Sequence, residues 1–384
     1  MSLTVEDVEA EMQAASQEGD PAVDALVSDL IDNQDVDGVN GLFRTIGTLK
    51  PGMDFSRLPE RLAQFLNEAA AEPPGWSEAD VTAAEGFFDH HHGVASMLQG
   101  TVGLIGTYLS PTGAFTLRST GRLGGVEGPG RRLSQSSRLF IDMGNRGALR
   151  DGTLAADVTK VRLVHASVRQ LHKMSGVWDY DTYGEPVSQK YMAGAICVFS
   201  VQVLEAMRNL GITVSEDDAH GFMCAWHYVN HYLGTPAKWL MPKDVDVVDR
   251  IWRIEREKEW RTSEHCTYMT QQAVKFYRDL LPPGVSDAFI TVTRIGLGDK
   301  YADMAGVPRS PIDLAGKPLA QGHKAVSSLG SGLFGGAAKK TVGVNPYDEV
   351  VGLAAKGYNQ IVKYAITHDQ DDQPQMHQEL GDNR

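Results

Sequence analysis

Apolar side chains recur at steps of three and four residues along most of the chain between Val81 and Pro308. That spacing places them on one face of an α-helix, whereas the alternation typical of β-strands is scarce. The longest regular run extends from Met192 to Leu210, and Gly211 follows it as a helix-terminating residue. The sequence therefore predicts an all-α fold, built as a single large helical bundle.

Helix start and stop signals support this prediction. Ser77 is followed three residues later by Asp80, and Ser215 is followed in the same way by Asp218. A serine with an acidic residue at this distance is typical of a helix N-terminus. Gly234 closes the helix that begins after Ser215.

The chain divides into three predicted segments. Residues 1–80 contain short helices separated by proline and glycine, so we expect an N-terminal helical extension. Residues 81–310 carry the helical periodicity of the main domain. Residues 311–384 begin with a glycine- and serine-rich linker, continue with an amphipathic helix near 347–367, and end in a polar tail.

Composition excludes several classes of protein. The net charge of −13 argues against a general nucleic-acid binder, which needs a basic surface. The three cysteines form no CxxC pair, so no zinc-knuckle or disulfide framework is indicated. The N-terminal residues show no export signal, and no apolar run approaches the roughly 20 residues that span a bilayer. We predict a cytoplasmic protein without a transmembrane segment; its oligomeric state stays open.

The segment DVTKVRLVHASVRQLHKMSG holds the most informative histidine. His165 lies at the edge of an apolar stripe at helical spacing, and Arg162 and Arg169 lie near the same face. The stripe consists of Val161, Val164, Val168 and Leu171. A haem would satisfy the imidazole through its iron and the two cations through its carboxylates. The alternative is a core histidine, with both arginines paired to ordinary carboxylates.

A second cluster combines turn glycines with basic and hydroxyl side chains. Arg131, Arg132, Ser136 and Arg138 open a helix after glycines at 121, 124, 125, 128 and 130. A cation and a hydroxyl over a reactive centre could stabilise negative charge that develops on bound dioxygen. A phosphate site at the helix N-terminus and a solvated basic turn are the alternatives.

Two histidine-rich patterns remain. His220, Cys224, His227 and His231 share one helical face, but the ends of this stripe lie about 16 Å apart along the helix axis. At most two neighbours could therefore share a metal ion, and ordinary polar packing is the alternative. Of the consecutive histidines 90–92, one could point inward while the others face solvent.

In the order of its sequence segments, the chain resembles the rubber oxygenase (latex clearing protein) family, which includes the fungal oxygenase of mycophenolic acid biosynthesis. The likeness covers about residues 80–310. The matching segments are STGRL from Ser119, RRL from Arg131 with Ser136, VRLVHASVR around His165, VSQKYMAGAICVFSVQVLEAMRNLGI, AWHYVNHYLGTPAKWLMP and TRIGLGDKYADMAGVP.

The resemblance implies a non-covalently bound haem b and a dioxygen-dependent reaction that cleaves an isoprenoid double bond to carbonyl products. By this likeness His165 matches the iron ligand, Arg132 and Ser136 match distal residues that act on dioxygen, and Arg169 and Arg294 match further family arginines. We expect Arg162 to join Arg169 and Arg294 in binding the haem. The absence of a CxxCH motif agrees with non-covalent attachment.

The chain also departs from the family pattern. Gln135 stands where some relatives have a lysine that caps the iron, and Thr116 stands near the place of their distal glutamate. Without an export signal, a diffusible terpenoid or lipid alkene is a better expected substrate than solid rubber. The alternatives are another haem-dependent tailoring oxidation and a non-catalytic haem-binding protein. Phe199 and Trp226 are candidate pocket walls, and Trp226 fits a core position better.

Overall fold

The computed structural model describes residues 5–119, 138–310, 312 and 347–368. Within these residues the regular elements are all helical, which confirms the all-α prediction. The two residues that were expected to cap helices do so. Ser77 Oγ accepts a hydrogen bond from the Ala79 amide, and Ser215 Oγ accepts one from the Asp218 amide at 3.0 Å.

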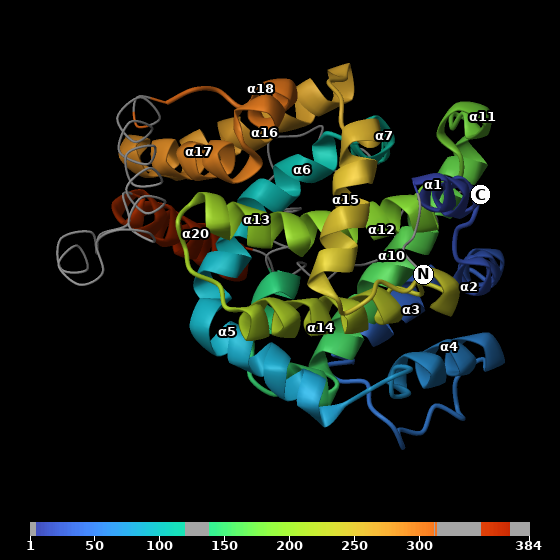
Figure 1. Cartoon of the computed structure of the whole chain (residues 1–384). Coiled ribbons are helices and arrows are strands. Elements are labelled where there is room, and N and C mark those ends of the chain that lie inside the picture. Colours follow the sequence, from blue (N-terminus) through green and yellow to red (C-terminus); the bar gives the residue numbers. More distant parts are fainter. Residues whose placement is uncertain (1–4, 120–137, 311, 313–346, 369–384) are drawn as a thin grey trace.

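Four short helices form the N-terminal part of the chain and lie together at one side of the molecule (Figure 1). They are α1 (Val5–Ser16), α2 (Pro21–Asp32), α3 (Val36–Thr45) and α4 (Glu60–Ala70). Helices α2 and α4 pack against the long helix α10 (Thr153–Ser175). Because their buried side chains join the same apolar core as the later helices, this part of the chain is not separately folded around a core of its own.

The centre of the fold is a layer of crossing helices. Helix α5 (Glu78–Leu98) lies beside α14 (Glu216–Tyr232), and the pair α12 (Gln189–Phe199) and α13 (Val201–Asn209) runs along α14 (Figure 1). The remaining central elements surround this layer. They are α6 (Leu104–Tyr108), α7 (Pro111–Ser119), α9 (Ala148–Asp151), α11 (Tyr180–Tyr183) and the 3-10 turn η2 (Ala237–Trp239).

The C-terminal helices lie mostly on the side opposite the N-terminal helices, but the first of them runs across α12, α13 and α14 (Figure 1). They are α15 (Val245–Glu259), α16 (Glu264–Leu280), α17 (Pro283–Leu297), α18 (Asp299–Ala305) and α20 (Asp348–His368). Helix α20 confirms the predicted helix near 347–367 and packs against α17. The expected glycine-rich linker of residues 313–346 lies outside the described residues.

The predicted continuous helix from Met192 to Leu210 is wrong at one position. The backbone of Ser200 leaves the helical region, with φ −114° and ψ −91°, and divides the run into α12 and α13. Opposite this break, α5 continues into a π-helical turn, η1 (Gln99–Gly103). The Gln99 side-chain amide donates to the Phe199 carbonyl at 3.2 Å, so a polar side chain satisfies a backbone group that the break leaves open.

One stretch in the described residues, Gln189–Asn209, is long and apolar enough to cross a membrane by length and composition. No such stretch was expected from the sequence. Because 61% of its 18-residue apolar window is buried inside the fold, its apolar character is explained by core packing of α12 and α13.

Candidate active site

His165 lies in the middle of α10 and is half-buried. Of the apolar stripe expected around it, Val168 is buried, while Val161, Val164 and Leu171 are half-buried. The most deeply buried positions of the helix include Leu154, Val158, Leu163 and Ala166. Several neighbours cover α10 on different sides, so the periodicity alone did not identify its most buried face.

Arg162 pairs with a carboxylate from the N-terminal part of the chain. Its Nε donates to Asp20 Oδ2 at 2.6 Å and its Nη2 donates to Asp20 Oδ1 at 3.1 Å. Such a two-pronged pair is the strongest geometry available to an arginine and a carboxylate. The sequence left two partners open for Arg162, a haem carboxylate and an ordinary carboxylate of the protein. The structure shows the second, Asp20, and contact of Arg162 with a haem stays a prediction.

Arg169, one helical turn after His165, is also paired, but one of its donor groups has no acceptor among the described residues. Its Nε donates to Asp24 Oδ1 at 2.7 Å and its Nη1 donates to the Val187 carbonyl at 3.2 Å. Burial raises the pKa of Asp24, although the Arg169 cation acts in the opposite direction. The side chain of Arg169 is only 4% exposed, and its buried Nη2 has no acceptor within the described part of the chain. Arg169 therefore retains one donor for a further acceptor.

Arg294 lies on α17 and is almost completely buried. It donates from Nη1 to the Val307 carbonyl at 2.5 Å, and from Nη2 to Asp303 at 2.5 Å and Asp299 at 3.1 Å. The Arg294 side chain holds the pKa of Asp303 below its usual range. These contacts tie α17 to α18, and the expected haem-binding role of Arg294 stays a prediction.

The two predicted distal residues, Arg132 and Ser136, lie outside the described residues, as does Gln135. The flanking residues are described. Ser119 is the last residue of α7, and its Oγ lies 3.2 Å from His172 Nε2. His172 lies two turns after His165 on α10. The chain resumes in a short helix over residues 138–143. Its Phe140 ring lies 5.0 Å from the Phe199 ring.

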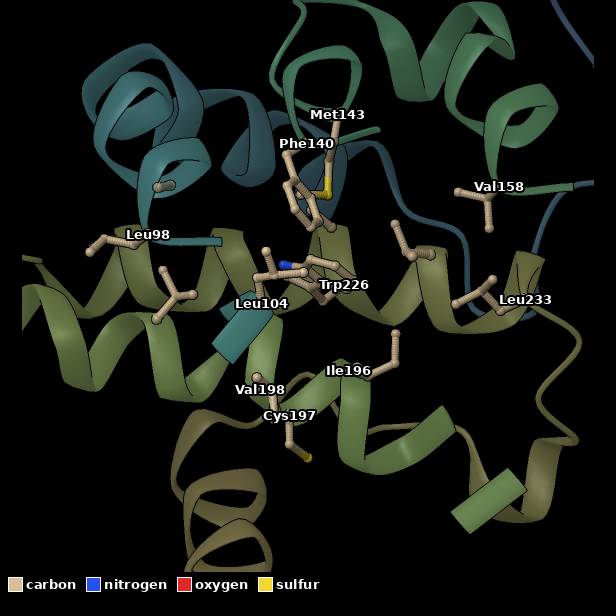
Figure 2. Close-up of a cluster of buried hydrophobic side chains, with 14 of the residues drawn as sticks. Leu98, Leu104, Phe140, Met143, Val158, Ile196, Cys197, Val198, Trp226 and Leu233 are labelled. Carbon is tan, nitrogen blue, oxygen red and sulfur yellow. The ribbon is translucent and has the colours of Figure 1, made fainter. Parts of the chain in front are cut away.

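Three aromatic side chains form an apolar wall in the core. The Phe199 and Trp226 rings stack at 5.9 Å, and Phe140 packs on Phe199. Figure 2 shows Phe140 and Met143 on one side of Trp226, with Ile196 beyond it toward α12. Trp226 is fully buried, as expected of a core residue, and its indole Nε1 has no acceptor in the described residues.

Sequence reasoning missed a pair of carboxyl groups. Asp142, on the helix over 138–143, lies beside Asp157 of α10. Burial and the Asp157 carboxyl raise the pKa of Asp142 to about 6. Lys160 Nζ lies 3.3 Å from Asp157 Oδ1. A carboxyl with such a raised pKa can hold or release a proton near neutral pH. No local pattern marks the two residues, because they come together only through packing of two helices.

Thr116, near the expected place of the family glutamate, is buried on α7, and its hydroxyl donates to the Thr112 carbonyl at 2.9 Å. A hydroxyl that is bonded to its own helix in this way cannot replace a carboxylate base.

The four side chains on the histidine-rich face of α14 do not form a single cluster. Cys224 Sγ lies 3.4 Å from His220 Nε2, whereas His227 Nδ1 lies 2.5 Å from the Met241 carbonyl oxygen. Two neighbours on this face, His220 and Cys224, lie close enough to share a metal ion, and their sharing one stays a prediction. Asp80, from α5, joins them as a third potential ligand that the stripe did not indicate.

The consecutive histidines 90–92 point in different directions. His90 and His91 lie 2.9 Å and 3.4 Å from the carboxylate oxygens of Asp218. His92 lies against Gly144, and burial lowers the pKa of its imidazole. His90 is exposed, whereas His91 and His92 are half-buried, so the expectation that two of the three face solvent is wrong.

The family model described as "ER-bound oxygenase mpaB/B'/Rubber oxygenase, catalytic domain" matches residues 89–325 of this chain. The chain belongs to this family. Membership in it makes the protein an oxygenase, and the matched range contains His165, Arg169, Arg132 and Ser136. The resemblance stated from the sequence is thereby confirmed at the level of the family.

Two individual proteins are also similar to this chain. The rubber oxygenase of Streptomyces sp. (strain K30) is 25% identical over 305 residues, which cover 76% of this chain and 72% of the relative. A structure of latex clearing protein in the closed state matches with a TM-score of 0.73 at 19% identity and covers 91% of each chain. The second likeness establishes that the two proteins share a fold.

Proposed function

We propose that this family member is a haem b oxygenase that acts on an apolar alkene and cleaves a carbon–carbon double bond to carbonyl products. Family membership supports the oxygenase class, and the name of the Streptomyces relative supports an isoprenoid-like substrate. The observation that carries the proposal is the position of His165, half-buried among valines on α10 and inside the region matched by the family model.

The residues around His165 are compatible with a haem. An imidazole is a common axial ligand of haem iron. Arg169 contributes a buried cation one turn away, and its Nη2 retains a donor that a haem carboxylate could accept. When bound, the haem would supply a redox-active iron for the reaction with dioxygen.

Other side chains would shape and charge the site. Phe140 and Phe199, whose rings pack together, are the proposed apolar wall for an alkene substrate, and the core residue Trp226 stacks on Phe199. Arg132 and Ser136 are the proposed donors toward oxygen, where a cation and a hydroxyl stabilise developing negative charge. We assign the proton-holding role to the Asp142–Asp157 pair, supported by the raised pKa of Asp142.

Hemin titration of the purified protein tests the iron ligand. The wild type should develop a Soret band that shifts on reduction and on addition of carbon monoxide. His165→Ala should lose that band while it retains its helical circular dichroism. His231→Ala is the matched control, because His231 is also half-buried but lies on α14 and not on α10. An unchanged Soret band in His165→Ala would contradict the assignment.

Oxygen-18 gas distinguishes the reaction types. Cleavage of a short isoprenoid alkene should place label from dioxygen in the carbonyl products. A different haem-dependent oxidation would yield labelled or unlabelled products without chain cleavage. Binding of haem without oxygen consumption across a panel of alkenes would favour a non-catalytic haem-binding protein.

A further inference from the structure

Helices α5 and α14 approach each other very closely. Gly221 faces the Ala83 backbone, and a Cβ atom at position 221 would overlap the Ala83 carbonyl. Figure 1 shows the two helices side by side over most of their length. This approach brings Asp80 of α5 to His220 and Cys224 of α14.

These three side chains offer one oxygen, one nitrogen and one sulfur ligand, and the ligand atoms all lie within 4.8 Å of one another. Cys224 Sγ is 3.4 Å from His220 Nε2, and His220 Nε2 is 3.9 Å from Asp80 Oδ1. Tetrahedral zinc, with bonds of about 2.0–2.3 Å, separates its ligand atoms by about 3.3–3.8 Å. The measured spacing therefore requires only small side-chain adjustments to hold such an ion.

The Asp80 carboxylate is held in a suitable orientation by its second oxygen. Lys243 Nζ donates to Oδ2 at 2.5 Å, and the Tyr228 hydroxyl donates to the same oxygen at 3.1 Å. The other oxygen, Oδ1, is the atom that faces His220. Partners that orient a ligating carboxylate in this way are typical of metal sites.

The cluster is open to solvent on one side. Cys224 is fully buried, Asp80 is half-buried and the His220 side chain is 50% exposed. A cation could enter past His220, and water could occupy the remaining coordination position. In the metal-free protein, burial and the Asp80 carboxylate raise the pKa of the Cys224 thiol to about 12. A bound cation would have to replace the thiol proton.

We propose that Asp80, His220 and Cys224 bind a divalent transition-metal ion of the zinc class, which links α5 to α14. A mixed set of thiolate, imidazole and carboxylate ligands selects such ions over magnesium or calcium. The competing interpretation is a metal-free contact in which the thiol simply donates to the imidazole. This site is separate from His165, so its test does not depend on the proposed haem chemistry.

Cobalt(II) and zinc titrations of the full-length, chelator-treated protein test the proposal. The wild type should bind a single equivalent of zinc by calorimetry. Cobalt(II) should give a thiolate-to-metal charge-transfer band, which reports directly on the cysteine ligand. Zinc should also raise the thermal unfolding midpoint, because it binds only the folded arrangement.

Two ligand variants and two matched controls complete the design. His220→Gln and Cys224→Ser should each weaken zinc binding by at least about tenfold. Cys224→Ser should also remove the charge-transfer band. His231→Gln, on the same helix, and Cys197→Ser, at another buried cysteine, should retain wild-type binding. If Cys224→Ser does not fold, His220→Gln still decides, because its side chain is half exposed.

Two results would overturn the proposal. The first is wild-type protein that shows no charge-transfer band with cobalt(II) and no zinc-dependent stabilisation. The second is a folded His220→Gln variant that binds zinc as tightly as the wild type. In either case the contact between Cys224 and His220 is a hydrogen bond within α14.

Discussion

Arg162 holds Asp20 through two parallel hydrogen bonds, of 2.6 Å and 3.1 Å, across 142 residues of sequence. The pair links the helix that carries His165 to the start of α2. Both side chains are largely buried, at 12% and 8% exposed, so the ion pair is little screened by water. The N-terminal helices are thereby part of the support of the candidate active site.

Asp20→Asn should destabilise the protein by about 2–4 kcal/mol, because it leaves the Arg162 cation buried without its counter-charge. Urea denaturation monitored by circular dichroism measures the change. Asp249→Asn is the control, since the Arg253–Asp249 pair is exposed and should contribute less than about 0.5 kcal/mol. Equal effects of the two substitutions would contradict the importance of the buried pair.

Gly234 permits the close approach of this ion pair. Its φ of +86° favours glycine, and a Cβ atom there would overlap both Arg162 Nε and Asp20 Oδ2. Gly234→Ala should therefore cost about 3 kcal/mol or more, from backbone strain and the displaced pair together. Gly52→Ala is the matched control, with a similar φ of +88° in open space, and should cost about 1 kcal/mol. Thermal unfolding of both variants measures the difference.

Asp142→Asn should change the pH dependence of stability. The folded pKa of about 6 lies above the ordinary value of 3.8, so the folded protein binds this proton more tightly than the unfolded chain does. The stabilisation from this proton is complete below the unfolded pKa and is lost as the pH rises through the folded pKa. Asp142→Asn should therefore stabilise the protein by about 1–2 kcal/mol near pH 7 and have little effect near pH 4. A constant difference across this range, measured by denaturation, would refute the raised pKa.

Arg169 should contribute to hemin affinity through its remaining buried donor. We expect Arg169→Met, made in an Asp24→Asn background, to weaken hemin binding about tenfold relative to Asp24→Asn alone. The background substitution removes the carboxylate that would otherwise be left buried without Arg169. Arg162→Met in an Asp20→Asn background, compared with Asp20→Asn alone, tests the second predicted haem arginine of α10 in the same way. Spectroscopic hemin titration measures all four proteins, and equal affinities for the Arg169→Met double variant and Asp24→Asn would exclude the role.

The sequence by itself determined the fold class and many helix ends. Ser77 and Ser215 cap their helices, and Gly211 and Gly234 adopt positive φ where their helices end. These features are local, since each depends on hydrogen bonds and backbone conformation within a few residues. The break at Ser200 was not predicted, because it depends on Gln99 from another helix.

The sequence also singled out α10 and the residue types of the candidate site, and the family match agrees with the resemblance inferred from them. Only the tertiary structure decided the partners of those residues. Asp20 and Asp24 reach α10 from α2, Asp142 reaches Asp157, and Asp80 reaches Cys224. Periodicity records which face of a helix is apolar, but it contains no information on which other helix covers that face. The charges that meet there are set by how the helices pack.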